Sequence, residues 1–333
     1  MTNPAPGLFT ITLPMPWELE SVNVHLVELE DGYLLVDSGV ATEECFDSLE
    51  RSLKTVPGFE WSKVRMLFLT HLHPDHIGLS WKILALSGAR LMMHRAEVEY
   101  LTLITGENRN PYFVQAMTNA GVPEELQNKM DRSMREIRKQ YHAHEPDWIL
   151  EGGEQIPVRG GTLAVVWTPG HSPGHVCLYS REHRYLISGD HILEFITPNI
   201  GWHPNQDMLA QYLNSLELLR SLDVEWILPS HGGPFRGHRE RIQATAEHHV
   251  ARCDQIMSLI GREPLTAHGL VEEMWKRKLS PFHHHFAVFE ILAHLEYLER
   301  RGKVASETRT GGALYWEPAK LAELPREALR TGK

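Results

Sequence analysis

Cysteine and long apolar runs are scarce in this sequence of 333 residues. Its three cysteines, Cys45, Cys177 and Cys253, are odd in number and far apart, so they do not form the framework of a disulfide-stabilised secreted domain. No stretch approaches the ~18 apolar residues of a membrane-spanning helix. The first residues also lack the basic segment and apolar core of a signal peptide. We therefore expect a reduced, cytoplasmic protein with no membrane partner.

Positive charge is limited as well. Lys and Arg together number 33, against 43 for Asp and Glu, which gives a formal net charge of −10. Because phosphate groups are bound by basic surfaces, this balance argues against a nucleic-acid-binding protein. The apolar fraction of 42% and the charged fraction of 23% are those of globular proteins, which excludes a disordered or fibrous chain. The length predicts about two domains.

The first of these domains is expected over residues 1–240. Apolar, β-branched runs alternate there with helical patterns, which favours a layered α/β fold. Residues 105–149 interrupt this alternation with two helix-like stretches, near 112–120 and 123–141. Some forty residues provide only a small core, so we expect an inserted lid or a dimer surface rather than a separate domain. The apolar residues of this segment, Pro111, Tyr112, Phe113 and Met117, could either form a roof over a functional site or pack against the body.

A second unit is expected over residues 241–333. Residues 1–249 carry a net charge of −12 and residues 250–333 one of +2, so the acidity ends near this boundary. Three helical patterns and a β-hairpin ending at Leu314–Trp316 follow one another, as in a winged-helix-like module. The helices are expected at Glu240–Ile260, His268–Lys278 and Ala287–Arg301.

Histidine is abundant, with 21 residues. The densest group is Thr70-His71-Leu72-His73-Pro74-Asp75-His76, directly after the apolar run Val64–Leu69. Imidazole nitrogens and carboxylate oxygens are the usual ligands of zinc and related metals. His71 and His73 alternate with Leu72 and should point the same way, whereas Asp75 and His76 should lie in the first turn of a helix opened by Pro74. The segment therefore offers two ligands to one metal and two to a neighbouring one.

Three later segments repeat this arrangement of an apolar run followed by a ligand-type residue. They are Thr168-Pro169-Gly170-His171-Ser172-Pro173-Gly174-His175, Ser188-Gly189-Asp190-His191 and Pro229-Ser230-His231-Gly232. Gly and Pro favour tight loops that present a side chain at a strand end. Four such strand ends predict one rim of one sheet system that gathers metal ligands.

The motifs THLHPDH, TPGHSPGH, SGDH and PSHG resemble those of the metallo-β-lactamase fold superfamily, over roughly residues 8–240. The resemblance implies an α/β fold, an αββα sandwich with two metals at one edge of its sheets. His71, His73 and His171 would bind the first metal, Asp75, His76 and His231 the second, and Asp190 would bridge both. Asp37 would support these ligands without binding metal. An Asp at the bridging position resembles the glyoxalase II-like branch and argues against β-lactam hydrolysis.

The C-terminal pattern adds to the resemblance. A metallo-β-lactamase domain followed by a short winged helix is similar to the lactamase-like protein 2 group, and the segment Phe289–Leu298 resembles the last helix of that module. This group contains thioester hydrolases and a single-strand ribonuclease. The resemblance therefore leaves two activities open, hydrolysis of an acyl substrate and cleavage of RNA held by the winged helix.

Two divalent ions that share a water molecule lower its pKa toward neutrality, so the expected nucleophile is a hydroxide rather than a Ser or Cys side chain. Asp75, besides ligating, would orient it as a catalytic residue. Zinc is favoured, although Fe or Mn would also accept these ligands. We expect hydrolysis of a small-molecule carboxylic thioester, ester or lactone. The acidic charge makes the alternative, a phosphodiesterase or single-strand ribonuclease, the second choice, and a homodimer is compatible with the insertion.

The remaining histidines have less defined roles. His175 is expected beside the metal ligands rather than among them, His191 in the pocket wall or the core, and His203 in an exposed loop that could reach the substrate. His283-His284-His285 allow a third metal site. Adjacent residues point apart on any regular element, so a loop before a helix is the favoured interpretation of this triplet.

Overall fold

The computed structural model describes residues 5–105, 111–141, 144–309 and 311–319. Its first sheet has six strands in sequence order. The first three strands pair antiparallel, and β3 to β6 pair parallel. These strands are β1 (Leu8–Pro14), β2 (Ser21–Glu28), β3 (Tyr33–Val36), β4 (Val64–Phe68), β5 (Arg90–His94) and β6 (Trp148–Leu150).

The second sheet has five strands in the order β11-β10-β9-β8-β7. All its pairs are antiparallel except β10 with β11. The two sheets pack face to face on buried side chains that include Val36, Phe68, Ile187 and Leu228. The strands are β7 (Gln155–Val158), β8 (Gly161–Trp167), β9 (Val176–Ser180), β10 (Tyr185–Gly189) and β11 (Trp226–Pro229).

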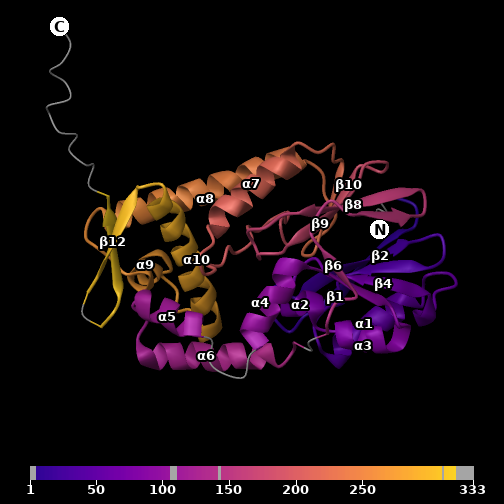
Figure 1. The fold of residues 1–333 in the computed structure, drawn as a ribbon, viewed down its shortest axis with the longest axis horizontal. Coiled ribbons are helices and arrows are strands. Elements are labelled where there is room, and N and C mark those ends of the chain that lie inside the picture. The colour runs from indigo at the N-terminus through magenta and orange to yellow at the C-terminus, as the bar shows by residue number, and fades with distance from the viewer. Residues whose placement is uncertain (1–4, 106–110, 142–143, 310, 320–333) are drawn as a thin grey trace, which may run out of the picture.

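Helices cover the outer faces of both sheets, so the expected αββα sandwich is confirmed (Figure 1). The first sheet carries α1 and α3, and the second packs against α7. A 3-10 turn, Trp61–Lys63, precedes β4. The helices of this part are α1 (Glu43–Leu53), α2 (Pro74–Ile77), α3 (Ser80–Ser87), α4 (Arg95–Thr105) and α7 (Met208–Arg220).

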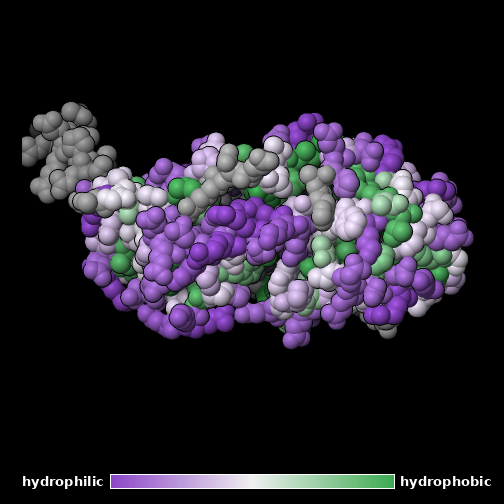
Figure 2. All heavy atoms as spheres, turned by 90° about the horizontal axis from the view of Figure 1, so that it is seen from below, coloured by the Kyte–Doolittle hydropathy of each residue, from purple (hydrophilic) through white to green (hydrophobic). Residues whose placement is uncertain are grey.

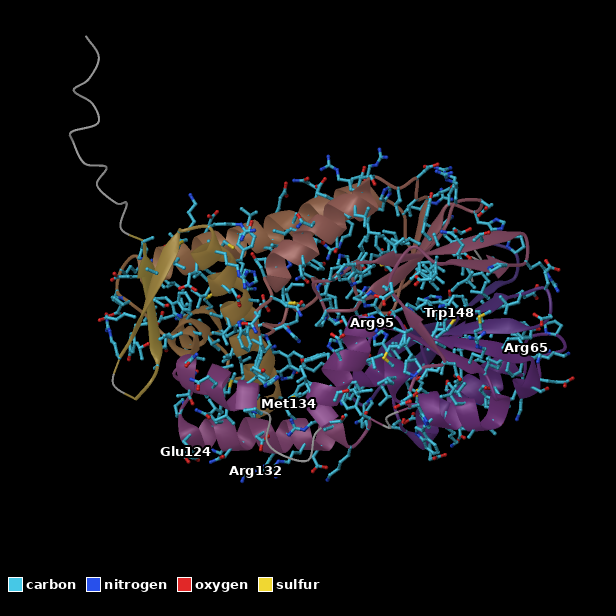
Figure 3. The ribbon with its side chains drawn as sticks, viewed as in Figure 1. Arg65, Arg95, Glu124, Arg132, Met134 and Trp148 are labelled. Atoms are coloured by element: carbon cyan, nitrogen blue, oxygen red, sulfur yellow. The ribbon has the colours of Figure 1, made fainter. Side chains whose placement is uncertain are left out.

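The insertion forms two helices, α5 (Pro111–Asn119) and α6 (Glu124–Arg138), which lie against the C-terminal helices (Figure 1). Arg132 points away from the body of the protein, whereas Met134 points inward (Figure 3). Hydrophilic side chains cover much of the lower face, and apolar residues show in the hollow among them (Figure 2). The insertion is therefore an amphipathic cover with a polar outer face.

The C-terminal module, residues 238–319, contains three helices and a hairpin, as expected. They are α8 (His238–Ile260), α9 (Ala267–Met274), α10 (Pro281–Arg300), β12 (Val304–Thr308) and β13 (Leu314–Pro318). The expected boundary at residue 240 lies in the first turn of α8. One buried cluster joins α7 to the module, for example through Leu216, Ile242 and Ile291. None of the described helices is long and apolar enough to cross a membrane.

The start of α10 differs from the expectation. The helix begins at Pro281, six residues before Ala287, because Ser280 caps it by accepting a hydrogen bond from the backbone N–H of His283. Pro281 occupies the first helical position, where its missing N–H has no cost. The expectation that His283, His284 and His285 lie in a loop is therefore wrong, since all three belong to the first turns of α10.

Candidate metal centre

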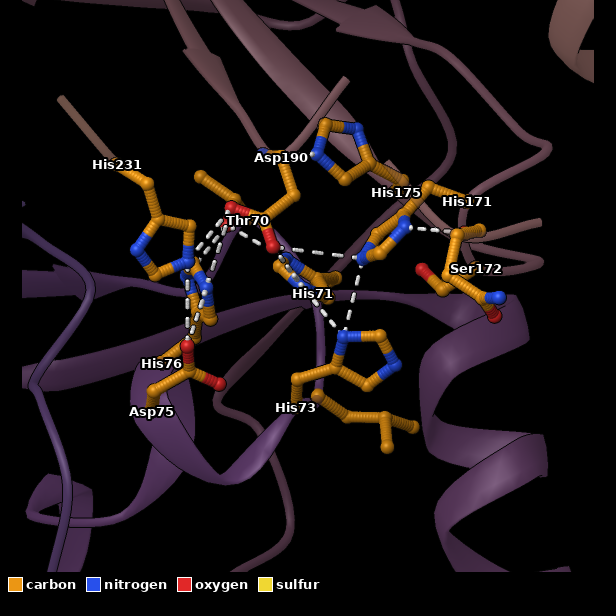
Figure 4. A network of polar contacts seen from close by, with 12 residues as sticks. Thr70, His71, His73, Asp75, His76, His171, Ser172, His175, Asp190 and His231 are labelled. Carbon is orange, nitrogen blue, oxygen red and sulfur yellow. Dashed lines mark hydrogen bonds and ion pairs between the residues drawn. The ribbon is translucent and has the colours of Figure 1, made fainter. Parts of the chain in front are cut away.

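Four strand ends, one from the first sheet and three from the second, bring the expected ligands together. His71 follows β4 of the first sheet, while His171, Asp190 and His231 follow β8, β10 and β11 of the second. Gly189, with φ of +52°, turns the chain into Asp190, and a Cβ there would lie 2.5 Å from His175 Nε2. The site consequently lies where the edges of the two sheets meet (Figure 4).

The first group consists of His71, His73, His171 and Asp190. His73 Nδ1 lies 2.9 Å from His71 Nε2 and 3.0 Å from His171 Nε2. Asp190 Oδ2 lies 3.5 Å from His171 Nε2 and 3.9 Å from His71 Nε2. Three imidazole nitrogens and one carboxylate oxygen thus face a common point, as tetrahedral coordination requires.

The second group consists of Asp75, His76 and His231. Asp75 Oδ2 lies 3.3 Å from His231 Nε2 and 3.7 Å from His76 Nε2. The other oxygen of Asp190, Oδ1, lies 3.5 Å from both of these nitrogens. Asp190 therefore stands between the two groups and presents one oxygen to each (Figure 4). This is the geometry of a bridging carboxylate.

The far nitrogen of four of these histidines is held by a fixed partner. His71 Nδ1 contacts Thr70 Oγ1 at 3.0 Å, and His76 Nδ1 lies 2.8 Å from Asp37 Oδ2. His171 Nδ1 lies 2.9 Å from the carbonyl oxygen of Asn199, and His231 Nδ1 lies 2.8 Å from that of Ser21. An imidazole that donates Nδ1–H to such an acceptor directs the lone pair of Nε2 into the site.

Burial and charge act differently in the two groups. Burial lowers the pKa of His73 to about 3 and that of His71 well below its ordinary value, which keeps both rings neutral. Burial also opposes the charged form of His231, but the carboxylates of Asp190 and Asp75 raise its pKa to about 10. The second group therefore presents a negative potential that attracts a cation.

The residues present fit a pair of divalent ions. Within the described part of the chain, His76 Nε2, His231 Nε2 and Asp190 Oδ1 are buried and make no hydrogen bond. Buried polar atoms without partners are costly unless something else binds them. The two groups of imidazoles and carboxylates are consistent with a dinuclear metal site, and such ligands suit zinc, iron or manganese.

The four supporting residues expected from the sequence take different positions. Asp37 is buried and accepts hydrogen bonds from the backbone N–H and the hydroxyl of Thr70. His175 is fully buried behind Asp190, whose N–H donates to its Nε2 at 3.2 Å. His191 is buried against Tyr212, with ring centroids 4.5 Å apart. His203 is half-buried and lines the cavity beside Tyr100.

Glu97 is a residue that the sequence analysis missed. This fully buried carboxylate on α4 accepts hydrogen bonds from the N–H of Leu72, from Ser172 Oγ and from the N–H of Gly174. It thereby joins the loop that carries His71 and His73 to the loop that carries His171. Its only sequence signal is a glutamate on the apolar face of a short helix, which is not specific.

Asn199 and Glu290 were also missed. Asn199 holds His171 through its backbone oxygen, and its side-chain amide donates to Glu290 Oε2 at 2.9 Å and to the carbonyl of Phe286 at 3.3 Å. Glu290 and Phe286 lie on α10. The C-terminal module therefore positions a side chain of the metal centre.

A cavity of about 440 Å³ opens onto the centre, with His73, Asp75, His171, Asp190 and His231 in its wall. The remaining wall is mostly apolar and aromatic and comes from α4, α5, α6, α10 and the loop before α7. Tyr112 and Phe113 of the insertion lie in this wall, whereas Met117 is buried in the core. Tyr112 and Phe113 therefore act as the expected roof, whereas Met117 packs against the body as in the alternative interpretation.

The fold and the paired ligand groups define a metallohydrolase of the αββα class. A profile described as "Metallo-beta-lactamase superfamily" matches residues 17–231, and one described as "Metallo-beta-lactamase-like, C-terminal domain" matches residues 253–319. The chain thus belongs to the metallo-β-lactamase superfamily and carries its C-terminal domain.

Similar proteins agree with this assignment. A metallo-β-lactamase family protein from Thermus thermophilus shares 30% identity, with a TM-score of 0.82 over 94% of this chain and 99% of that one. A beta-lactamase-like protein 2 homolog from Caenorhabditis elegans is 25% identical over 79% of this chain and 73% of its own. An acyl-coenzyme A thioesterase from Gallus gallus is 26% identical over 69% and 79%.

Proposed function

We propose that this metallohydrolase cleaves carboxylic thioesters, and that its substrates carry an acyl group bound in the apolar cavity. The observation that carries the proposal is the junction of that cavity with the side chains of the metal centre. Cavities of this size and composition accept small organic ligands. The similarity to an acyl-coenzyme A thioesterase supports the same substrate class.

The proposed ligands are His71, His73 and His171 for one ion, Asp75, His76 and His231 for the other, and Asp190 for both. A pair of divalent ions supplies an acidified water molecule and polarises a carbonyl group. The chain contributes the positioning. Asp190 would connect the two ligand groups, and Asp75, which lies in the cavity wall, would orient the attacking hydroxide.

The side chains that could act as alternative nucleophiles are unsuitable. All three cysteines are buried, and burial raises the pKa of Cys45 to about 11 and that of Cys177 to about 12, so neither is a thiolate at neutral pH. Ser172 lies in the cavity wall, but its hydroxyl donates to Glu97. A water nucleophile is therefore favoured.

The cavity also favours an acyl substrate over RNA. Among the described lining residues, Arg138 is the one Lys or Arg side chain, and it forms an ion pair with Asp131 at 3.0 Å. RNA-binding enzymes hold the phosphate backbone with several cations. Aromatic residues of α10, such as Phe286 and Phe289, instead offer an apolar surface for an acyl chain.

The test is an assay of the metal-loaded protein on acetyl-, octanoyl- and palmitoyl-coenzyme A, on a lactone and on a fluorescent single-stranded RNA, each with and without chelator. We expect chelator-sensitive hydrolysis of the thioesters, with a preference for the longer chains. Cleavage of RNA without hydrolysis of any acyl substrate would overturn the proposal.

A matched pair of variants tests the role of the cavity. Phe286→Ala should raise KM for octanoyl-coenzyme A by ~10-fold or more, because an aromatic contact worth about 1.5–3 kcal/mol is lost, and should change KM for the acetyl ester little. Phe195→Ala is the control, since Phe195 is 80% exposed and lies outside the cavity wall. An equal KM for octanoyl-coenzyme A in the two variants would contradict binding of the acyl chain at α10.

A further inference from the structure

A second cluster of potential ligands lies in the C-terminal module, away from the catalytic centre. His268 and Glu272 are on α9, and His284 is on α10. His268 Nδ1 lies 3.0 Å from His284 Nε2, and one ligand atom from each of the three residues lies within 4.8 Å of the others. These three residues are called the module cluster below.

The local sequence explains how the cluster forms. Thr266 caps α9 by accepting from the N–H of Gly269, so that His268 and Glu272, four residues apart, share one face of the helix. His284 is buried against that face, whereas its neighbours His283 and His285 line the cavity. His283 and His285 therefore lie in the cavity wall, and His284 lies at the contact between α9 and α10.

We propose that the module cluster binds one divalent transition-metal ion of the zinc type, with water completing the coordination. Bonds of about 2.0–2.1 Å in tetrahedral geometry place ligand atoms roughly 3.3 Å apart. The two imidazole nitrogens are already close to this separation. Glu272 is exposed, and in the described part of the chain it forms no ion pair. Its side chain can therefore rotate to bring the carboxylate to the ion.

The catalytic centre provides an internal reference for this geometry. Its imidazole nitrogens face one another at 2.9 Å and 3.0 Å, and the pair in the module cluster faces at 3.0 Å. In both places a carboxylate completes the set. Burial also lowers the pKa of His268 and of His284, which keeps both rings neutral and able to bind a metal.

Another histidine pair of the module shows the contrasting case. His249 Nδ1 and His294 Nε2 are 3.2 Å apart, but His294 Nδ1 lies 2.7 Å from the carbonyl oxygen of Glu290. His294 therefore donates from Nδ1 to this carbonyl and accepts at Nε2 from His249, so the two rings form an ordinary hydrogen bond. No described carboxylate joins this pair in a ligand group. Glu272 is therefore what distinguishes the module cluster.

The ion would fasten the helices that build one wall of the cavity. His284 lies two residues from Phe282 and from Phe286, both in that wall. The N–H of His268 donates to the carbonyl of Ala120, at the end of α5, at 2.9 Å. An ion bound here joins α9, the start of α10 and the insertion, and so stabilises the roof of the cavity.

The test starts from protein whose catalytic centre is already loaded, so that only additional binding is measured. Zinc is titrated by calorimetry and cobalt by its visible absorption, and the thermal unfolding midpoint is recorded with and without added zinc. We expect one further equivalent to bind and the midpoint to rise, because an ion that binds the folded state stabilises it. Absence of a further equivalent in the wild type would overturn the proposal.

Variants locate this ion. Glu272→Gln and His268→Asn should weaken the additional binding by at least ~10-fold and abolish the rise in midpoint. Glu273→Gln is the control, because this neighbouring glutamate pairs with Lys276 at 3.2 Å. Circular dichroism establishes that each variant is folded. Unchanged binding in both cluster variants would overturn the proposal, whichever substrate the catalytic centre accepts.

Discussion

Histidines gather in two regions of this protein, the sandwich edge and the C-terminal module, but their surroundings differ. At the sandwich edge, Asp75 and Asp190 face the imidazoles, and four of the five rings are held through their far nitrogen. In the module, helices supply the imidazoles, and the one carboxylate of the cluster, Glu272, is exposed. The first region is organised before metal binds, whereas the second needs a side chain to move.

This comparison identifies the features that would give the two proposed metal sites different affinities. Spacing of ligands alone is similar in the two regions, since imidazole nitrogens face at about 3 Å in both. Supporting hydrogen bonds and buried charge are what differ. Partners outside the coordination sphere typically change metal affinity or activity ~10–100-fold. We therefore expect the catalytic centre to bind its ions much more tightly than the module cluster.

The largest effect is expected at Asp190. Asp190→Asn keeps the shape of the side chain but removes the charge that faces both groups, so turnover of an acyl thioester should fall by more than the ~100-fold typical of supporting residues. Cobalt titration should show loss of the tight ions. Binding at the module cluster should remain, which would sharpen the comparison.

The control for Asp190 is Asp223→Asn, which removes an exposed carboxylate that pairs with Arg184 at 2.9 Å. Its turnover and its metal content should match those of the wild type. If Asp190→Asn kept full activity, the assignment of a bridging carboxylate would be wrong.

A smaller loss is expected from Asp37→Asn. Asp37 has φ of +63°, which asparagine adopts readily, so the backbone should be preserved. The charge that accepts from Thr70 and orients His76 disappears, and activity and metal affinity should fall ~10–100-fold. Steady-state kinetics and chelator competition measure the two effects. Asp31→Asn, in an exposed turn, is the control and should leave activity and metal affinity unchanged.

These two predictions depend on residues that the sequence made recognisable. The four motifs that follow apolar runs contain every proposed ligand. The division of these ligands between two metals, and the role of Asp37, came from the resemblance to the metallo-β-lactamase superfamily. Glu97 could not be found in this way, because it joins Leu72 and Gly174, which are 25 and 77 positions away. Asn199 acts on His171 through a main-chain oxygen, which any residue carries.

The fold was predictable to a similar extent. Long periodic segments such as α8 follow from the sequence, whereas the strands β1, β6 and β7 were not anticipated. The early start of α10 was missed although Ser280-Pro281 is a strong helix-start signal, because the polar histidine triplet favoured a loop. Contact with α9 accommodates His284, whereas His283 and His285 line the cavity, and no sequence pattern reveals these tertiary contacts.

The two regions should respond differently to alkaline pH in metal-free protein. Carboxylates raise the pKa of His231 to about 10, so its stabilisation is complete below about pH 6.5 and is lost as the pH rises toward 10. Burial lowers the pKa of His249 to about 2 and that of His294 to about 4. Their contribution is lost as the pH falls below about 6.5, because the unfolded chain takes up protons first.

Each proton taken up or released on unfolding changes the free energy of unfolding by about 1.4 kcal/mol per pH unit. Hydrogen exchange across a pH series, read separately for peptides of α8–α10 and of β4–α2, measures the two responses. Alkali should open the metal centre and not the module, whereas acid should open both regions, because burial lowers the pKa of His71 and His73 as well. Loading the metals should remove the alkaline effect, because an ion replaces the proton. Equal opening of both regions at alkaline pH would contradict the comparison.

The smallest effect concerns the link between the regions. Asn199→Ala removes the amide that donates to Glu290 and to Phe286 on α10, but it keeps the backbone oxygen that holds His171. The ring should be held less firmly, so we expect a fall in kcat of less than ~10-fold, below the usual range for a direct partner, with a shifted cobalt spectrum. Asn128→Ala, on the exposed face of α6, is the control. An unchanged cobalt spectrum would show that the module does not position this ligand and that the two regions act independently.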